Sequence, residues 1–218
     1  MKLKWYGHSS FLITADNGLK IITDPYESGG YDGAVGYGEI PDSADIVLCS
    51  HDHPDHGYTE ALKGDFQVVD KAGITSLKGI DFNGVEAYHD TEEGSQRGTV
   101  IMFSFCVDGV NICHLGDLGH EIDAETALKI GNVDLLLIPV GGMFTINGKV
   151  ADKVIETINP KIVIPMHYKT GKCGFPLARI DEFIDRKRNI SLMASYEIAI
   201  TKETLPKKQM IMILDHAL

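Results

Sequence analysis

The stretch HDHPDHG at residues 51–57 constrains the fold more strongly than any other part of this 218-residue chain. It places three histidines and two aspartates in six positions, directly after a short apolar run that predicts a buried strand. Side chains two apart in an extended segment point to the same side, so His51 and His53 can reach one metal ion. Asp55 and His56 lie beyond a proline that bends the chain, so they can face a second ion. The fold must therefore bring further ligands to the end of this strand.

Three further residues of metal-binding type follow closely on other strand-like runs: His89, Asp117 and His167. In folds built on sheets, loops converge at strand ends, where a rigid frame holds them. His89 and Asp117 are therefore candidates for a third ligand to the first ion and for a carboxylate that bridges two ions. His167 is a candidate for completing the second ion. Imidazole and carboxylate ligands without a thiolate suit zinc, and also iron or manganese, and a position left open for water would mark a catalytic site.

Each of these residues also has an ordinary structural interpretation, but their combination favours a metal site. HDHPDHG alone would be a polar surface loop, and His89, Asp117 or His167 alone would be a structural histidine or a turn residue. Arg97, in a glycine-containing loop after His89, is a candidate anion contact, although a solvated arginine is the commoner case. We expect Asp90, His114 and His120 to fix imidazole tautomers. Tyr168 and His8 are expected to support or line the site.

The order of predicted elements changes along the chain, from mostly strands to alternating helices and strands and back to strands. A hairpin signal at Asn17-Gly18 and a glycine-rich loop at 27–42 fall in the first part. This order predicts an α/β (α+β) protein of one domain, 1–218, with two mixed sheets packed face to face and helices outside; one large mixed sheet is the alternative. The predicted helices are 58–63, 121–130, 149–158 and 177–187, and the predicted strands are 3–7, 10–14, 19–23, 45–50, 66–70, 84–88, 99–107, 110–115, 133–139, 161–165, 191–200 and 209–214.

The composition narrows the classes of partner. A net charge of −11 and a pI near 5.2 argue against nucleic acid, because that binding rests on lysine and arginine neutralising phosphates. A small anionic substrate is compatible with this charge, since bound cations reverse the local field. The four cysteines form no CxxC pair, the N-terminus has no signal-peptide core, and no apolar run approaches the ~18 residues of a membrane span. We expect a cytoplasmic protein with a small-molecule substrate and no membrane or nucleic-acid partner; no feature indicates an oligomeric state.

The stretch HDHPDH matches the HxHxDH signature of the metallo-β-lactamase superfamily, and the resemblance extends over nearly the whole chain. Within the superfamily, the chain resembles the branch of small metal-dependent hydrolases that includes the ascorbate-phosphate lactonases. The combination of matching segments is more specific than any one of them. The other segments are Trp5–Ile13 (WYGHSSFLI), Thr23-Asp24-Pro25, His114–Asp117 (HLGD), Ile138–Gly142 (IPVGG) and Ile164–Tyr168 (IPMHY).

The resemblance implies a four-layer αββα sandwich, in which helices flank two mixed β-sheets and a dinuclear site, with two zinc ions expected, lies at one edge. The expected function is a metal-dependent hydrolase that activates a bridging water to cleave an ester, lactone or phosphodiester bond. Asp55 would be catalytic as well as a ligand, because it can orient the nucleophile or give a proton to the leaving group. The resemblance implies that His51, His53 and His89 bind the first ion and that Asp55, His56 and His167 bind the second. Asp117 would bridge the two ions.

Two alternatives to this hydrolase stay open. One is an iron-loaded redox enzyme of the same fold. It is disfavoured by His53, because the redox branch of the superfamily carries a glutamate at this position. The other is a metal-binding protein without turnover. Metal analysis combined with a broad screen of hydrolysable substrates separates the three classes.

Overall fold

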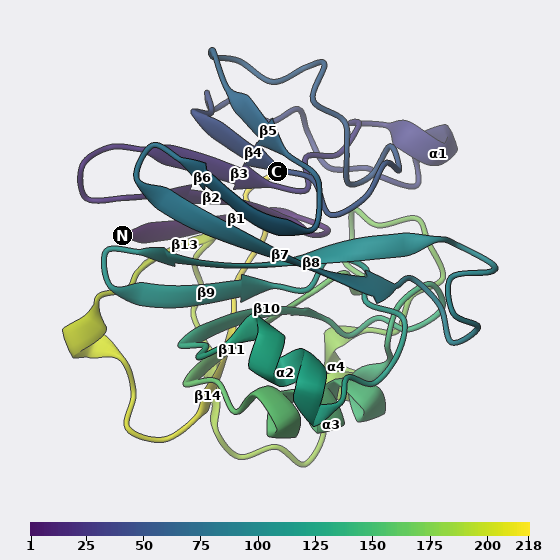
Figure 1. Cartoon of the computed structure of the whole chain (residues 1–218). Helices are drawn as coiled ribbons and strands as arrows, with labels where there is room; N and C mark the ends of the chain where they lie inside the picture. Colours follow the sequence, from purple (N-terminus) through teal and green to yellow (C-terminus); the bar gives the residue numbers. More distant parts are fainter.

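The computed structural model describes all 218 residues and contains two mixed β-sheets that pack face to face (Figure 1). The first sheet has six strands in the order β13-β1-β2-β3-β4-β5. Antiparallel pairing joins β13, β1, β2 and β3, whereas β3, β4 and β5 pair in parallel. Its strands are β1 (Lys2–Gly7), β2 (Ser10–Thr14), β3 (Lys20–Thr23), β4 (Ile46–Leu48), β5 (Gln67–Val69) and β13 (Glu197–Ala199).

The second sheet has eight strands in the order β12-β14-β11-β10-β9-β8-β7-β6. Pairing is antiparallel from β6 to β9 and parallel from β9 onward to β12. The predicted fold class with two mixed sheets is therefore confirmed, and the single large sheet is excluded. The strands are β6 (Gly73–Leu77), β7 (Ile80–Tyr88), β8 (Thr99–Val107), β9 (Val110–His114), β10 (Leu135–Pro139), β11 (Ile162–Met166), β12 (Ile190–Leu192) and β14 (Met210–Ile213).

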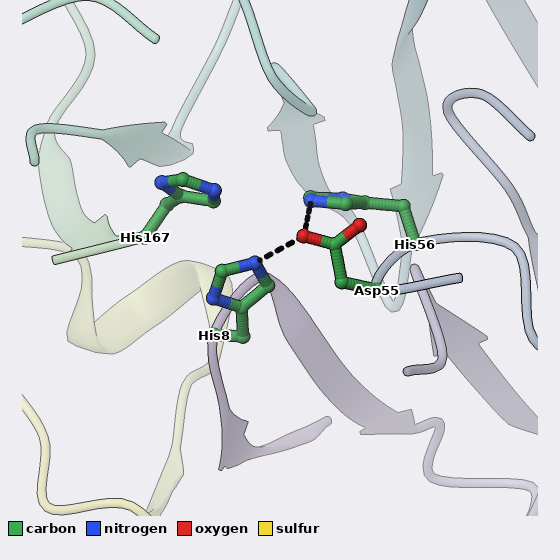
Figure 2. A group of neighbouring side chains, drawn as sticks. All are labelled: His8, Asp55, His56 and His167. Atoms are coloured by element: carbon green, nitrogen blue, oxygen red, sulfur yellow. Dashed lines mark hydrogen bonds and ion pairs between the residues drawn. The ribbon is translucent and has the colours of Figure 1, made fainter. Parts of the chain in front are cut away.

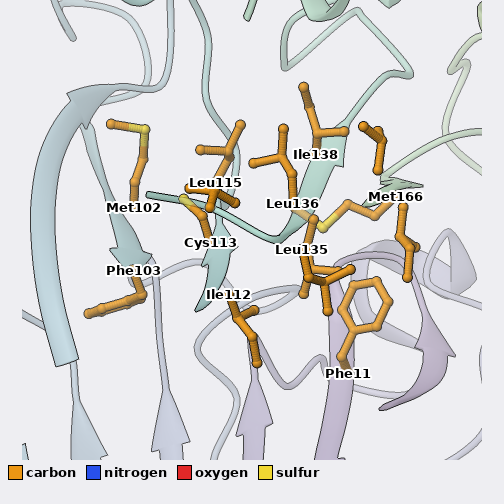
Figure 3. Packing of buried hydrophobic residues seen from close by; sticks show 14 of the residues in the cluster. Phe11, Met102, Phe103, Ile112, Cys113, Leu115, Leu135, Leu136, Ile138 and Met166 are labelled. Atoms are coloured by element: carbon orange, nitrogen blue, oxygen red, sulfur yellow. The ribbon is translucent and has the colours of Figure 1, made fainter. Parts of the chain in front are cut away.

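Apolar side chains from both sheets meet in one large buried cluster (Figure 3). In β1, Leu3 and Trp5 belong to this cluster, whereas Tyr6 belongs to a second cluster on the opposite face, as the two-residue repeat of a strand requires. Every residue of β10 and β11 is buried, as expected for parallel strands that are covered on both faces. Figure 3 includes Phe11 of the six-stranded sheet and Leu135 of the eight-stranded sheet.

The outer face of the eight-stranded sheet is covered by helices. These are α2 (Ala124–Ile130), α3 (Gly148–Ile158) and α4 (Ile180–Ile184), which gather on one side of the molecule in Figure 1. The side chains of Asp123 and Asn147 accept hydrogen bonds from backbone amides in the first turns of α2 and α3. Such caps satisfy amides that would otherwise have no partner, so they fix where these two helices begin.

The outer face of the six-stranded sheet is covered by irregular chain, with one short helix, α1 (Gly30–Gly33). A cluster of 12 buried residues forms there. It includes Ile22 of the sheet, Tyr37 of the predicted loop 27–42, and Tyr26, which directly precedes that loop. The glycines of this loop lower its helix propensity, so the chain covers the sheet without regular structure. The fourth layer of the expected sandwich therefore consists mainly of loops.

The helix predicted at 58–63 is absent, and the chain forms turns there instead. The segment lies between Gly57 and Gly64, which leaves little length for a stable helix. The amide of Tyr58 donates to the carbonyl oxygen of Pro25 at 2.9 Å, so it is tied to a neighbouring loop. The prediction is therefore wrong because tertiary contacts outweigh a weak local pattern.

Two strand predictions also need correction. Strand β6 and the first half of β7 lie where no strand is predicted, and they form a hairpin that turns at Lys78 and Gly79, both with positive φ. The strand predicted at 191–200 is divided into β12 and β13, which belong to different sheets. The break includes Ala194, whose φ of 47° no extended strand can contain.

All four cysteines are free, in agreement with a sequence that has no disulfide pattern. Cys49, Cys113 and Cys173 are buried. Cys106, on β8, is exposed, although its apolar neighbours in sequence would predict burial. No helix of the structure has the length and apolar character needed to cross a membrane.

Candidate metal centre

The strand ends that carry the candidate ligands meet at one edge of the sandwich. Strands β1, β3 and β4 run in one direction, and so do β7, β9 and β11 within the other sheet. The loops that follow strands of one direction emerge at the same edge of each sheet. The structure thereby brings together all the predicted ligands, which follow β4 (His51, His53, Asp55 and His56), β7 (His89), β9 (Asp117) and β11 (His167).

The first group of candidate ligands consists of His51, His53 and His89, each of which has a ring nitrogen within 4.8 Å of one on the other two. His51 Nε2 and His53 Nδ1 are 2.9 Å apart. Burial and the facing His56 lower the pKa of His51 to about 3, so its imidazole is neutral at pH 7. Neutral imidazole is the form that binds a metal.

The second group consists of Asp55, His56 and His167, joined by His8 (Figure 2). Asp117 lies between the two groups. Its Oδ1 is 3.2 Å from Nε2 of His56, and its Oδ2 is 3.3 Å from Nε2 of His167. The same Oδ2 is 3.4 Å from Nε2 of His89, which belongs to the first group. Asp117 is thus the one carboxylate that touches imidazoles of both groups.

The donor set fits divalent cations. Ligand atoms about 2.0–2.1 Å from a tetrahedral ion lie about 3.3 Å from one another, close to the separations around Asp117. His56 Nε2 and Asp117 Oδ1 are buried and have no hydrogen-bond partner, although buried polar atoms are nearly always satisfied. Ligation of a cation would satisfy both atoms. Oxygen and imidazole nitrogen without sulfur suit zinc, manganese or iron.

The electrostatics of the cluster favour positive charge between the carboxylates. Burial tends to raise the pKa of Asp117, but the facing His167 and His56 hold it well below its ordinary value. Burial also disfavours the charged form of His56, which for an imidazole lowers the pKa. The carboxylates of Asp117 and Asp55 outweigh this effect and raise the pKa of His56 well above its ordinary value. Asp117 is therefore ionised at neutral pH, and the space beside it favours a proton or a metal cation.

A buried network beneath the ligands fixes their orientation, and its central residue is Asp24. Its carboxylate accepts hydrogen bonds from the Ser50 amide at 2.8 Å, from the Ser50 hydroxyl at 2.7 Å and from Nδ1 of His56 at 2.8 Å. Because Ser50 Oγ donates to Asp24, it accepts from Nδ1 of His51 at 3.0 Å. Both histidines therefore direct Nε2 toward the cluster, which is the role that conserved outer partners of metal ligands play.

Asp24 and Ser50 are absent from the residues that the sequence analysis assigned to the site. Thr23-Asp24-Pro25 was noted only as a segment that resembles the superfamily. The sequence does contain a sign that Asp24 belongs to the site, because this charged residue directly follows the buried strand β3, at the same edge as His51. The left-handed backbone of Asp24, with φ of 39°, is a further sign that the position serves a purpose besides packing.

His8 contacts a candidate ligand directly, in line with the expectation that it supports or lines the site. Its Nε2 donates to Oδ2 of Asp55 at 3.0 Å, and its ring centroid is 4.2 Å from that of His167. Burial lowers its pKa to about 4, so it is a neutral donor at pH 7. The turn that presents it begins at Gly7, where a Cβ atom would lie 2.3 Å from the ring of Tyr37, so only glycine fits.

His114 and Asp90 support the site, but each does so differently from a partner of a ligand imidazole. Nε2 of His114 donates to the carbonyl oxygen of Ser9 at 2.9 Å, and its Nδ1 accepts from the amide of Gly116 at 3.1 Å. It thereby shapes the turn that leads to Asp117. Asp90 binds only backbone amides of its own loop, so the expectation that it fixes an imidazole tautomer is wrong.

His120 and Tyr168 lie outside the cluster. Nε2 of His120 accepts from the amide of Tyr88 at 3.1 Å, and its ring packs on the Tyr88 ring, so it supports the end of β7. Tyr168 is buried in the core, with its ring centroid 5.4 Å from that of Trp5. Neither residue lines the cavity above the ligands, so their interpretation as site residues is not supported.

The fold and this cluster define a class of protein, a two-sheet sandwich with a histidine and aspartate metal site at one edge. Residues 2–167 match the sequence family described as the Beta-lactamase superfamily domain. The chain belongs to this family, the metallo-β-lactamase superfamily. The predicted superfamily is therefore confirmed.

Its relatives place it more closely, among small metal-dependent hydrolases. A UPF0173 metal-dependent hydrolase from Carboxydothermus hydrogenoformans is 32% identical in an alignment that covers 88% of this chain and 94% of that protein. Another from Archaeoglobus fulgidus is 26% identical in an alignment that covers 93% of this chain and 96% of that protein. The crystal structure of a protein from Thermotoga maritima, described as a zinc-dependent hydrolase of the metallo-β-lactamase superfamily, superposes with a TM-score of 0.80. It is 33% identical and covers 98% of this chain and 97% of its own, and the predicted branch and enzyme class are confirmed.

Proposed function

We propose that this chain binds two divalent cations, with zinc expected, and hydrolyses an ester, lactone or phosphodiester bond of a small molecule. The observation that carries the proposal is the position of Asp117, whose oxygens face His56 and His167 of one group and His89 of the other. A carboxylate in this position is suited to bridging two cations. The relatives described as metal-dependent hydrolases support the same activity.

The ligands would divide as the two groups divide. His51, His53 and His89 would hold the first cation, and Asp55, His56 and His167 would hold the second, with Asp117 shared. Two such cations supply an activated water at neutral pH and polarise the substrate oxygen. The low pKa of Asp117 keeps it ionised through the reaction, and Asp24 keeps Nε2 of His56 directed at the cluster.

Asp55 is the residue of the chain that is best placed for proton transfer. It lines the cavity above the ligands, and its Oδ2 is held by Nε2 of His8 at 3.0 Å. Burial tends to raise the pKa of Asp55, but His56 and His8 keep it below its ordinary value, so the carboxylate starts the reaction ionised. Its Oδ1 can then accept a proton and pass it to the leaving group.

The test is metal analysis of the purified protein together with a panel of ester, lactone and phosphodiester substrates. We expect two metal equivalents in the natural protein, one in each of the variants His51→Ala and His167→Ala, and loss of hydrolysis in both. His120→Ala is the matched control, because this imidazole lies outside the cluster, and it should keep both equivalents and full activity.

Full metal content in both cluster variants would overturn the ligand assignment. Iron as the only bound metal, with redox activity toward an electron-transfer partner, would support the redox alternative. Complete metal loading without turnover of any substrate on the panel would support a metal-binding protein instead of a hydrolase.

A further inference from the structure

A cavity of about 200 Å³ opens above the metal-ligand cluster. This volume is below the range of about 300–1,000 Å³ found for drug-sized ligands, so the cavity suits a small molecule. Its floor consists of candidate ligands, which the proposed function explains. Its wall consists of residues without a role so far: Tyr31, Arg97, Phe144 and Phe175.

The apolar part of the wall is formed by three aromatic rings from three separate loops. The ring of Phe175 packs edge-to-face against the ring of Tyr31, with 5.4 Å between centroids, and against the ring of Phe144, with 5.6 Å. These are favourable aromatic geometries. The rings are only partly covered by one another, and Tyr31 is 46% exposed, so ring surface is available to a ligand in the cavity. Such a wall favours a planar, apolar group.

The backbone that presents Tyr31 is strained. Tyr31 and Asp32 both adopt left-handed conformations, with φ of 53° and 55°. A residue other than glycine is strained in this region, and such residues gather at ligand sites. The glycine-rich loop holds Tyr31 at the cavity despite this strain.

Arg97 is the cationic part of the wall. Its guanidinium lies 5.6 Å from the centroid of the Phe144 ring. The arginines that form ion pairs are Arg179 and Arg186, so Arg97 has no carboxylate partner. It is half-buried, so the group is partly removed from water without a counter-ion. Guanidinium groups in this state are suited to bind carboxylate or phosphate through two parallel hydrogen bonds.

The loop that carries Arg97 is organised by Asp90. The carboxylate of Asp90 accepts four hydrogen bonds of 2.8–3.0 Å, from the amides of Glu92, Gly94, Gln96 and Arg97. Asp90 directly follows the candidate ligand His89. The backbone at Arg97 is therefore held close to the candidate ligand His89 by a short loop whose amides bind Asp90, in contrast to an arginine on a free surface.

The local charge also favours an anionic ligand. The chain has a net charge of −11, so its general field repels anions. With divalent cations bound, the balance at the cavity would be reversed, because the cations and Arg97 together would outweigh the two aspartates of the floor. Small anions would thus be attracted to this cavity in particular.

We infer that the substrate is a small anionic compound, such as an aryl ester, in which a planar apolar ring carries a carboxylate or phosphate group that pairs with Arg97. Its ring would pack against the exposed surfaces of the Phe144 and Phe175 rings, and its scissile bond would lie over Asp55 and Asp117. This inference rests on the proposed hydrolase function and adds to it the class of substrate.

Ligand binding tests the inference without turnover. Isothermal titration calorimetry of the zinc-loaded protein would compare 4-hydroxybenzoate with 4-hydroxybenzamide, which have the same shape and differ in charge. We expect the benzoate to bind about 10- to 100-fold more tightly, the range of a charge-assisted hydrogen-bond pair. Arg97→Gln should abolish this preference, and phenyl phosphate in the same titration tells whether carboxylate or phosphate is the preferred anion.

The matched controls separate Arg97 from general charge and from the metal. Arg186→Gln removes an exposed arginine outside the cavity and should keep the preference. Phe175→Leu should weaken both ligands by about two- to tenfold, because it removes the aromatic contact and keeps an apolar side chain. A thermal melt of each variant shows that it is folded. A preference that survives in Arg97→Gln would mean that the anion binds the cations directly, and it would overturn the inference.

Hydrolysis of a matched pair of esters distinguishes failure of this inference from failure of the proposed function. The pair is 4-acetoxybenzoate and 4-acetoxybenzamide. We expect a lower KM for the benzoate and, in Arg97→Gln, a KM for the benzoate raised about 10- to 100-fold with kcat nearly unchanged. Equal KM values for the two esters would count against the inference alone. Selective binding without hydrolysis of either ester, and without turnover of any lactone or phosphodiester on the panel, would count against the proposed function alone.

Discussion

The floor and the wall of the cavity are built in different ways. The floor consists mainly of buried side chains that follow strand ends, and these candidate ligands are held by buried partners such as Asp24 and His8. The wall consists of partly exposed side chains on loops, of which only the loop of Arg97 is organised by a buried carboxylate, Asp90. Atoms that must stay in fixed positions thus lie on the rigid frame, and atoms that select a ligand lie on loops. Substitutions in the floor should therefore impair catalysis far more than substitutions in the wall.

The largest effect is expected for Asp117→Asn, which keeps the size of the side chain and removes its charge. We expect kcat/KM to fall about 1,000-fold or more, because the two cations that this carboxylate would bridge contribute several kcal/mol of transition-state stabilisation. Steady-state kinetics and metal analysis measure this. Asp181→Asn, at an exposed position of α4, is the control. Near-normal activity of Asp117→Asn would contradict the expectation that substitutions in the floor impair catalysis more than substitutions in the wall.

Asp24→Asn tests the support beneath the floor. We expect metal affinity to fall about 10- to 100-fold, because an amide in this position no longer fixes Nδ1 of His56 and the Ser50 hydroxyl equally well. Competition with a chromophoric chelator gives the affinity. Asp42→Asn is a matched control, because this carboxylate also accepts hydrogen bonds, from Tyr6 and Lys4, but lies away from the ligands. Equal losses in the two variants would indicate a general effect on the fold.

Asp90→Asn tests how the wall is held. We expect the amides of Glu92 and Gln96 to exchange hydrogen faster and the KM for an anionic substrate to rise roughly tenfold, with metal content unchanged. Burial opposes ionisation of Asp90, but the amides of Arg97, Glu92, Gln96 and Gly94 lower its pKa to about 2. The carboxylate therefore stabilises the loop above its ordinary pKa of about 4, and this stabilisation is lost as the pH falls through about 2. Hydrogen exchange that is unchanged in the variant would contradict this account.

The smallest effect is expected for Phe144→Leu. The substitution removes the ring beneath the Arg97 guanidinium and keeps an apolar side chain. A cation–π contact near the surface contributes about 0.5–1 kcal/mol, so we expect a rise in KM of about two- to fivefold with an unchanged kcat. A fall in kcat approaching that expected for Asp117→Asn would show that the wall takes part in catalysis itself.

The sequence predicts which candidate ligands gather in the floor, because these residues follow a local rule. His51 and His53 form a dense motif at a strand end, and His89 and His167 follow apolar runs directly. Hydrophobic runs also predict most of the strands. The roles of the ligands follow from the superfamily resemblance, and metal analysis is the measurement that tests them.

The wall and the supporting residues could not be predicted in the same way. Tyr31, Phe144 and Phe175 are unremarkable in sequence, and only the tertiary structure brings their loops together. Asp90 was expected to contact an imidazole because it adjoins His89, but a carboxylate beside several free amides binds those amides first. Asp24 could have been found, because it directly follows a buried strand at the same edge as the motif.

The shared position of Asp117 has a mechanical consequence. His51 and His56 follow a strand of the six-stranded sheet, and His89 and His167 follow strands of the eight-stranded sheet. Cations held by both sets of ligands would tie the two layers together at one edge, as a cross-link would. The layers could then separate only by giving up the metal, and the free energy of metal binding would become part of the free energy of unfolding. Chelation should therefore lower the temperature at which the whole sandwich melts, and the supply of metal would govern the lifetime of the protein as well as its activity.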